Sequence, residues 1–234
     1  MAVSKSKRGL KTQKLILQTA KEFFYEKGYE KTTIKEICEK IDIRTGNLAY
    51  YYKTKDDLVK AIYDDLFLES YTFVSTHLEH KTSALERNTI NSLVDFRARL
   101  RDKNTTRFYL DNLKKKQLSL YLDNNLIRFV KQFITELKLD ISEKELQDIL
   151  YAEYGLRREL TIRMIENPEE NDFWDYFTTI NIFRCRLYKI DENLMRAFLF
   201  NAMEFERIFT NPAIDLKFSA VVGLLYNNRE LYLF

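Results

Sequence analysis

Apolar residues recur every three or four positions along most of the chain, with polar residues between them. Such spacing is typical of amphipathic α-helices. Over residues 10–27 the apolar positions form one stripe, made by Ile16, Ala20, Phe23 and Phe24. Gly28 follows directly, and glycine ends helices because it adopts left-handed backbone conformations at low cost. The pattern therefore predicts a first helix over residues 10–27.

A second, short helix follows the first. Thr33 and Glu36 have the spacing of a capping box, in which two side chains satisfy backbone N–H groups at a helix start. After them the apolar positions recur at helical intervals at Ile34, Ile37, Cys38 and Ile41. We therefore expect Cys38 to be a small residue of the core rather than a redox group.

A third helix is predicted after the short turn Asp42-Ile43-Arg44, from about Thr45 to Tyr52. Leu48 and Tyr52, four residues apart, share one face and point toward the second helix. The side chains left facing outward are Arg44, Thr45, Asn47, Tyr50, Tyr51 and Lys53. Two short helices joined by a tight turn form a helix-turn-helix unit. An ordinary helical hairpin with a solvated face would show the same spacing.

The remainder of the chain has the pattern of further helices. Thr54 is the predicted N-cap of a fourth helix, which extends to about His77. Asn167-Pro168 and Asn211-Pro212 each place a proline at a first helical position. The predicted helical segments are 84–101, 106–122, 125–139, 143–166, 169–190, 192–210 and 213–228. The chain holds only five Gly and two Pro, which argues against turn-rich β-folds, so the predicted fold class is all-α.

The net charge of +3 is unevenly distributed. Residues 1–60 hold 14 Lys and Arg against 8 Asp and Glu, whereas residues 61–234 hold 24 against 27. The cations at the start of the chain are Lys5, Lys7, Arg8, Lys11 and Lys14. We interpret them as a basic N-terminal arm. A basic end on a neutral-to-acidic body indicates a polyanionic partner, and a solvated tail is the alternative.

Few residues of this chain could support catalysis or hold a metal. Cys38 and Cys185 lie far apart, and the only imidazoles are His77 and His80, so we expect no metal site, disulfide or cofactor. The sequence has no Gly-rich phosphate loop, which argues against an enzyme, and no catalytic residue is predicted. It also has no run of 18 apolar residues and no apolar leader. We therefore expect a cytoplasmic chain with no membrane partner.

Residues Thr32–Leu58, with Ala20–Tyr29 before them, closely resemble the DNA-binding domain of TetR-family transcriptional regulators. The resemblance covers about residues 11–60. It implies an N-terminal three-helix helix-turn-helix domain, residues 1–54 with the basic arm. It also implies a larger C-terminal helical ligand-binding and dimerisation domain, residues 55–234. The protein would be a homodimeric repressor, released from a palindromic operator in double-stranded DNA by a small-molecule effector. A regulator that responds to a protein partner instead is the alternative.

The resemblance also implies roles for single residues. The residues implied to contact phosphates are Thr33, Tyr50, Tyr51 and Lys55. Lys35 is implied to contact bases or the DNA backbone. The residues implied to read bases are Arg44, Thr45 and Asn47. Gly46 matches a position where a small residue lets the helix approach the groove. Ala49 stands where the family commonly has Tyr, and Tyr51 replaces the usual His. The resemblance therefore does not carry the family's base preference to this chain.

The last two predicted helices are apolar on two sides. A helix with two apolar faces needs two partners, one of which would be a second subunit. The candidate interface residues are Phe198, Ala202, Phe205, Phe218, Ala220, Gly223 and Leu224. A central core helix in a monomer is the alternative.

Two charged residues stand on apolar faces of the C-terminal part. Glu153 lies on the stripe of the helix predicted over 143–166, and Arg184 on that of the helix predicted over 169–190. A buried charge needs a partner, and the favoured interpretation is that these two residues pair with each other. Alternatively, one of them contacts a ligand, with Tyr154, Trp174 and Phe183 nearby.

Overall fold

The computed structural model describes residues 7–78, 81–115, 127 and 129–209, which contain α-helices and no β-strand. The helices are α1 (Lys7–Lys31), α2 (Ile34–Lys40), α3 (Thr45–Tyr51), α4 (Lys55–His77), α5 (Ala84–Arg99), α6 (Lys103–Leu113), α8 (Glu143–Glu166), α9 (Phe173–Tyr188) and α10 (Glu192–Phe209). Residues 129–136 are also helical. The predicted all-α class is confirmed. None of the described helices is long and apolar enough to cross a membrane.

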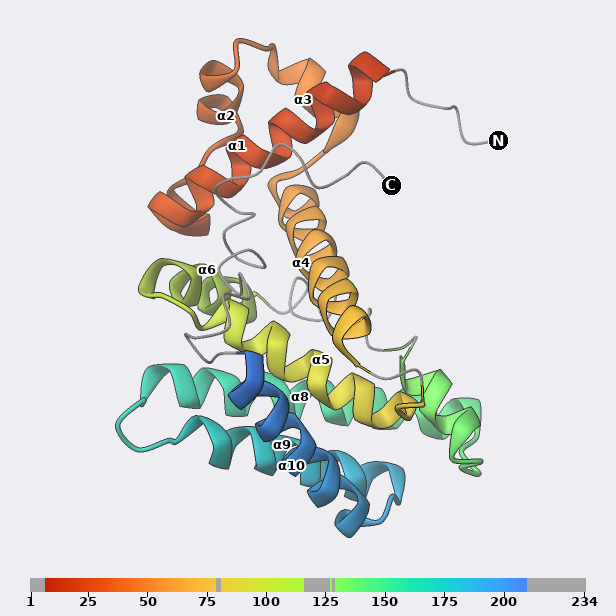
Figure 1. Ribbon diagram of the computed structural model, residues 1–234. Helices are drawn as coiled ribbons and strands as arrows, with labels where there is room; N and C mark the ends of the chain where they lie inside the picture. Colours follow the sequence, from red (N-terminus) through yellow and green to blue (C-terminus); the bar gives the residue numbers. More distant parts are fainter. Residues whose placement is uncertain (1–6, 79–80, 116–126, 128, 210–234) are drawn as a thin grey trace.

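The helices form a small N-terminal group and a larger group, with α4 reaching from one to the other (Figure 1). α1, α2 and α3 pack together at one end, and α4 contacts both α1 and α5. α4 begins at Lys55, the residue at which the second domain is expected to start. Because α4 contacts helices of both groups, the division into residues 1–54 and 55–234 stays a prediction.

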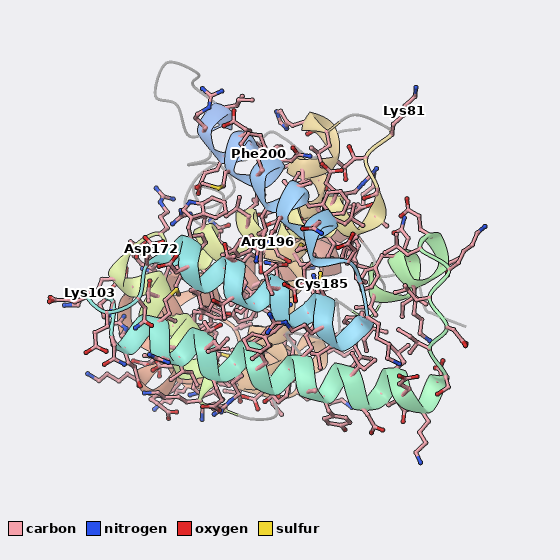
Figure 2. The ribbon with its side chains drawn as sticks, turned by 90° about the horizontal axis from the view of Figure 1, so that it is seen from below. Lys81, Lys103, Asp172, Cys185, Arg196 and Phe200 are labelled. Carbon is pink, nitrogen blue, oxygen red and sulfur yellow. The ribbon has the colours of Figure 1, made fainter. Side chains whose placement is uncertain are left out.

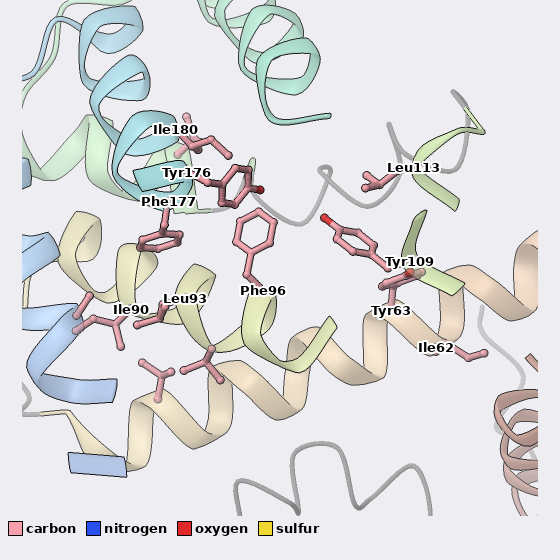
Figure 3. Packing of buried hydrophobic residues seen from close by; sticks show 14 of the residues in the cluster. Ile62, Tyr63, Ile90, Leu93, Phe96, Tyr109, Leu113, Tyr176, Phe177 and Ile180 are labelled. Atoms are coloured by element: carbon pink, nitrogen blue, oxygen red, sulfur yellow. The ribbon is translucent and has the colours of Figure 1, made fainter. Parts of the chain in front are cut away.

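α5 is the central helix of the larger group. It contacts α4, α6 and α10, and most of its residues are buried. The ring of Phe96 on α5 meets Tyr176 and Phe177 of α9 edge to face, with centroids 5.5 and 6.2 Å apart (Figure 3). Aromatic residues of the core thus join helices that are distant in sequence.

α1 departs from prediction at its start and agrees at its end. It begins at Lys7 rather than near Leu10, so Lys7 and Arg8 of the expected basic arm lie on a helix, as do Lys11 and Lys14 within the predicted range. Lys and Arg are good helix formers, and nothing in this segment forbids a helical backbone. At the other end, Gly28 has a φ of 80° and interrupts the helix, as the sequence predicts.

The start of α9 also differs from prediction. Asn167 is the C-cap of α8, and residues 168–170 form a turn, so Pro168 does not begin a helix. Instead Asp172 is the N-cap, and its Oδ1 accepts hydrogen bonds from the backbone N–H groups of Trp174 and Asp175 at 2.7 and 3.1 Å. The aspartate satisfies two orphan N–H groups at once, which the proline cannot do.

α10 buries the residues that were expected to face a second subunit. Phe198, Ala202 and Phe205 lie in the core of their own chain, where α10 packs on α5 and α9. Their burial within the chain leaves them little surface for a second subunit, and their assignment to a dimer interface stays a prediction. The other four candidates, Phe218, Ala220, Gly223 and Leu224, lie outside the described residues, as does the helix predicted over 213–228.

α10 nevertheless has a second apolar face, which is exposed. Its large exposed apolar residues are Phe200, Met203 and Ile208, and Phe200 is 63% exposed. Figure 2 shows Phe200 and Arg196 on α10, and Cys185 on α9. α10 thus presents apolar residues both to the core of the chain, through Phe198, Ala202 and Phe205, and to the exposed surface.

Candidate nucleic-acid interface

A capping box fixes the start of α2. The backbone N–H of Glu36 donates to Thr33 Oγ1 at 3.2 Å, and the backbone N–H of Thr33 donates to Glu36 Oε2 at 3.0 Å. Lys27 Nζ donates to Glu36 Oε1 at 2.7 Å. This hydrogen bond, with those from Thr33, lowers the pKa of Glu36 to about 2. The ion pair between Lys27 and Glu36 therefore ties α2 to α1. Thr33 is exposed, but its hydroxyl is already occupied by the cap.

The turn between α2 and α3 depends on Asp42, which has a left-handed φ of 52°. The backbone N–H of Ile43 donates to Cys38 O at 3.1 Å, and that of Asp42 donates to Glu39 O at 3.4 Å. This pair of bonds is a Schellman motif, in which glycine usually occupies the left-handed position. Asp tolerates this conformation better than most residues, which is why the sequence pattern did not reveal the motif.

Leu48 and Tyr52 fix which face of α3 looks outward. Both are buried against the N-terminal core, as predicted, together with Ile37 and Cys38 of α2. The opposite face exposes Arg44, Thr45, Gly46, Asn47, Ala49 and Tyr50.

Three exposed polar side chains at the start of α3 are available to a ligand. In the part of the chain that the structure describes, the side chains of Arg44, Thr45 and Asn47 make no hydrogen bond and no ion pair. Arg44 is the N-cap residue of α3, but its side chain does not cap the helix. The structure thus brings the predicted base-reading residues together at one helix end, and their role stays a prediction.

Gly46 is not required by packing within the chain. A Cβ atom added at this position would meet no described atom within 4 Å. Glycine in a helix costs roughly 0.5–1 kcal/mol relative to alanine, so its presence is not explained by the isolated domain. This observation supports the prediction that a surface outside the chain approaches α3 here.

The two tyrosines at the end of α3 are placed differently. Tyr50 is 74% exposed, whereas Tyr51 is half-buried and packs against the core. Their rings meet edge to face with centroids 5.0 Å apart. Tyr50 is thus the more accessible of the two tyrosines that are predicted to contact phosphates.

The two lysines predicted to bind DNA differ in their present partners. Lys35 is exposed, and its Nζ lies 3.7 Å from Glu39 Oε1 on the same helix. Such an exposed pair exchanges easily for another anion. Lys55 Nζ instead donates to the backbone oxygens of Tyr29 and Thr32 at 2.8 and 3.0 Å.

Lys55 therefore has a structural role that sequence reasoning missed. Its Nζ also lies 4.1 Å from the centroid of the Tyr29 ring, and burial lowers the pKa of its ammonium. It joins the start of α4 to the connection between α1 and α2. Two of its three N–H groups are occupied, so a phosphate contact stays a prediction for the third.

The basic start of α1 adjoins α3. Gln13 on α1 is hydrogen-bonded to the side chain of Tyr52, directly after α3. Lys7, Arg8, Lys11 and Lys14 lie on the same end of α1. They add positive charge to the end of α1 that lies near α3 (Figure 1). The hydrophobic pattern does not mark this start of the helix, because Lys7, Arg8 and Gly9 carry no apolar side chain.

Glu153 and Arg184 pair with each other, as the favoured interpretation predicted. Arg184 Nε donates to Glu153 Oε1 at 2.8 Å, and the arginine and glutamate side chains are 3% and 4% exposed. Tyr188 donates to Glu153 Oε2 at 2.9 Å, and Arg184 Nη1 donates to Asn88 Oδ1 at 2.6 Å. The carboxylate is thus fully engaged within the chain.

The other predicted ligand residues do not converge on a site. Tyr154 is buried, whereas Phe183 is 40% exposed. Trp174 packs with Phe173 and Phe177, with ring centroids 5.9 and 5.7 Å away. A cavity is lined by residues of α1, α4, α5 and α6, among them Phe24, Tyr63 and Phe108, and none of the five predicted ligand residues lines it. Their binding role therefore has no support from their placement.

A capped α2, a Schellman turn and an α3 with an exposed polar face define a helix-turn-helix domain, attached here to a larger helical domain. Residues 16–62 match the family described as bacterial regulatory proteins, tetR family. Residues 16–62 therefore have the DNA-binding fold of the tetR family. No curated protein matches the chain.

Three solved structures align with most of the chain at low identity. A tetR family transcription regulator from Shewanella sp. PV-4 is 13% identical, with a TM-score of 0.46, over 76% of this chain and 96% of its own. TylP, a TetR regulator from Streptomyces fradiae, is 17% identical, with a TM-score of 0.45, and the alignment covers 84% of this chain and 100% of TylP. AmtR from Mycobacterium smegmatis is 16% identical, with a TM-score of 0.36, and the alignment covers 81% of this chain and 92% of AmtR.

Proposed function

We propose that this protein is a sequence-specific transcription regulator that inserts α3 into the major groove of an operator. The observation that carries the proposal is the cluster of Arg44, Thr45 and Asn47, exposed and without partners among the described residues at the start of α3. Side chains of these types bond to base edges. The start of a recognition helix is where helix-turn-helix proteins place their base-reading residues.

The surrounding residues supply contacts to the DNA backbone. The proposed phosphate contacts are Lys35, Tyr50, Tyr51 and the cations at the start of α1, with Thr33 and Lys55 as further contacts. Phosphate contacts fix the position of a protein on DNA but do not carry sequence information. Gly46 lets the helix approach the groove without a side chain in between.

The protein acts as a cytoplasmic homodimer on a palindromic operator and represses transcription until a small-molecule effector releases it. The exposed apolar residues of α10, namely Phe200, Met203 and Ile208, support the dimer, because exposed apolar clusters mark interaction surfaces. Phe200→Glu places a charge there and is expected to yield monomers in sedimentation equilibrium. Tyr151→Glu places the same charge on an exposed aromatic residue of α8, outside this face, and serves as the control. A dimer that persists in Phe200→Glu would remove this face from the interface.

Selection of binding sites from random duplex DNA tests the proposed function. We expect an inverted repeat, because a two-fold dimer presents two α3 helices. The double variant Arg44→Ala/Asn47→Ala serves as the matched control and should enrich no sequence. Equal enrichment by the variant, or no enrichment by the unaltered protein, would contradict the proposal.

A further inference from the structure

α6 is a helix of the larger domain that contacts the helix-turn-helix domain. It packs against α1 and against α8, and Figure 1 shows it between α1 and the helices of the larger domain. The chain passes from one domain to the other at the start of α4, at Lys55. Hinges between domains lie at such ends of elements. Contacts away from α4 are therefore needed to hold the helix-turn-helix domain at one angle.

An arginine of α6 binds the carboxyl end of α1. Arg107 Nη2 donates to the backbone oxygens of Tyr25 and Glu26 at 2.9 and 3.0 Å. The helical backbone is interrupted soon afterwards at Gly28, where φ is 80°. Backbone oxygens at a helix end lack partners within the helix and form the negative end of its dipole. The guanidinium of Arg107 satisfies two of these oxygens at once and so ties α1 to α6.

Gly28 also allows α6 to approach α1 closely. A Cβ atom at this position would lie 3.2 Å from Asp111 Oδ2 and 3.3 Å from Arg107 Nε. Both distances are shorter than an ordinary van der Waals contact. The glycine therefore serves the left-handed backbone and leaves room for the arginine.

A lysine just after α6 makes a second contact with the same end of α1. Lys115 Nζ lies 2.9 Å from Glu30 Oε1 and 4.5 Å from the centroid of the Tyr29 ring. The hydrogen bond from Lys115 lowers the pKa of the Glu30 carboxyl, so the pair is charged at neutral pH. The Glu30 side chain is 70% exposed, and exposed pairs add little to folding stability. Loss of this contact should therefore affect the angle of the domain more than its stability.

α6 is itself fastened to the larger domain. Arg158 Nε on α8 donates to the backbone oxygen of Leu113 at 2.9 Å. Lys114 Nζ lies 2.7 Å from Glu166 Oε1, also on α8. When the helix-turn-helix domain turns relative to the larger domain, it must therefore break the contacts of Arg107 and Lys115 or pull α6 away from α8.

We propose that Arg107 and Lys115 are positioning residues that set the spacing between the two half-sites of the operator. The proposal rests on the proposed function, in which two copies of α3 read an inverted repeat. Half-site spacing reflects the distance and angle between the two recognition helices of a dimer. One added base pair shifts a half-site by about 3.4 Å and turns it by about a tenth of a helical turn. A domain held by α6 cannot follow this shift, whereas a released domain pivots at the start of α4.

Binding to duplexes of altered spacing tests the proposal. The selected inverted repeat is compared with versions that have one base pair more or one fewer between the half-sites, at one fixed salt concentration. The unaltered protein should bind both altered duplexes about tenfold more weakly, the effect of losing one hydrogen bond to a charged group. The double variant Arg107→Met/Lys115→Met keeps apolar stems of similar length but has no donors. It should bind all three duplexes within about threefold of one another.

Lys114→Met is the matched control. Lys114 lies at the same end of α6, but its partner Glu166 belongs to the larger domain, so this variant should keep the tenfold preference for one spacing. Circular dichroism and urea midpoints check folding and should change little in either variant, because Arg107 and Lys114 are exposed. If the double variant does not fold, Glu30→Gln weakens the contact of Lys115 from the exposed side. It should reduce the preference at least about twofold.

Spin labels measure the angle of the domain without DNA. Cys38 and Cys185 are buried, so labels are attached at the exposed positions Lys40→Cys on α2 and Tyr151→Cys on α8. Labelled chains are mixed with an excess of unlabelled chains, so that a dimer carries one labelled subunit. Double electron–electron resonance should give a broader distribution of distances when Arg107→Met/Lys115→Met is added. The distribution should stay unchanged when Lys114→Met is added.

The outcomes separate this proposal from the proposed function. An equal preference for one spacing in the unaltered protein and the double variant overturns it, as does equal binding of all spacings by the unaltered protein. A distance distribution that the double variant leaves unchanged overturns it as well. If no duplex is selected at all, the proposed function fails, while the spin labels still decide whether Arg107 and Lys115 hold the domain at one angle.

Discussion

Removal of the Glu153 carboxylate tests whether the buried pair with Arg184 holds the larger domain together. In Glu153→Ala, Arg184 loses the acceptor of its Nε at 2.8 Å, and Tyr188 loses its acceptor at 2.9 Å. Arg184 is 2% exposed, so water cannot readily replace the carboxylate. Its Nη1 keeps Asn88, but the charge is left uncompensated. Breaking a buried ion pair in this way costs about 3–5 kcal/mol.

Urea denaturation followed by circular dichroism measures this effect. With a denaturant dependence of about 1–3 kcal/mol per molar, the midpoint should fall by at least about 1 M. Glu166→Ala is the matched control on the same helix, because Glu166 and Lys114 form an exposed pair with 44% and 53% exposed side chains. Exposed pairs contribute about 0–1 kcal/mol. The double variant Glu153→Leu/Arg184→Met should recover most of the loss, because apolar residues replace buried pairs well. A loss below about 1 kcal/mol in Glu153→Ala would refute the reasoning.

Three further predictions concern the turn, Glu69 and Lys55. Asp42→Val should destabilise the protein by roughly 1–2 kcal/mol in urea, because Asp42 has a φ of 52°, whereas Asp42→Gly should not; equal effects would contradict this. Burial raises the pKa of Glu69 from 4.5 to about 7, so folding favours its neutral form, and that contribution to stability is lost as the pH rises through about 7. At about pH 8, Glu69→Gln should be more stable than the unaltered protein by about 1 kcal/mol after allowance for solvent screening. At about pH 4.5 the two proteins should be equally stable. Thermal melts that show a difference of the same size at both pH values would argue against the raised pKa as the cause. Lys55→Gln loses two hydrogen bonds to backbone oxygens and should destabilise the protein by about 1–3 kcal/mol. An unchanged urea midpoint would contradict the structural role of Lys55 and leave only its proposed contact with a phosphate.

Features set by neighbouring residues could be predicted from the sequence. The capping boxes of Thr33 with Glu36 and of Thr54 with Asp57 involve residues three positions apart, so the spacing alone reveals them. The burial of Leu48 and Tyr52 follows from helical periodicity in the same way. Because these features are local, the sequence alone predicts correctly which face of α3 looks outward.

Features set by distant residues could not be predicted. The two apolar faces of α10 are visible in the sequence, but only the packing on α5 and α9 decides that Phe198 and Phe205 lie inside and Phe200 outside. Lys55 matches a phosphate-binding pattern, yet its partners are Tyr29 on α1 and Thr32 in the connection from α1 to α2. The cavity likewise needs α1, α4 and α6 together, and no single segment signals it.

The central claim is that α3 reads bases through residues near its start. Titration of Asn47→Ala against the selected duplex and a scrambled duplex, at one fixed salt concentration, tests it most directly. We expect a loss of about 1–3 kcal/mol on the selected duplex, relaxed preference at one base pair, and little change on the scrambled duplex. Tyr51→Phe is the control and should weaken both duplexes by similar factors, because phosphates carry no base identity. Equal losses on both duplexes for Asn47→Ala would contradict the claim.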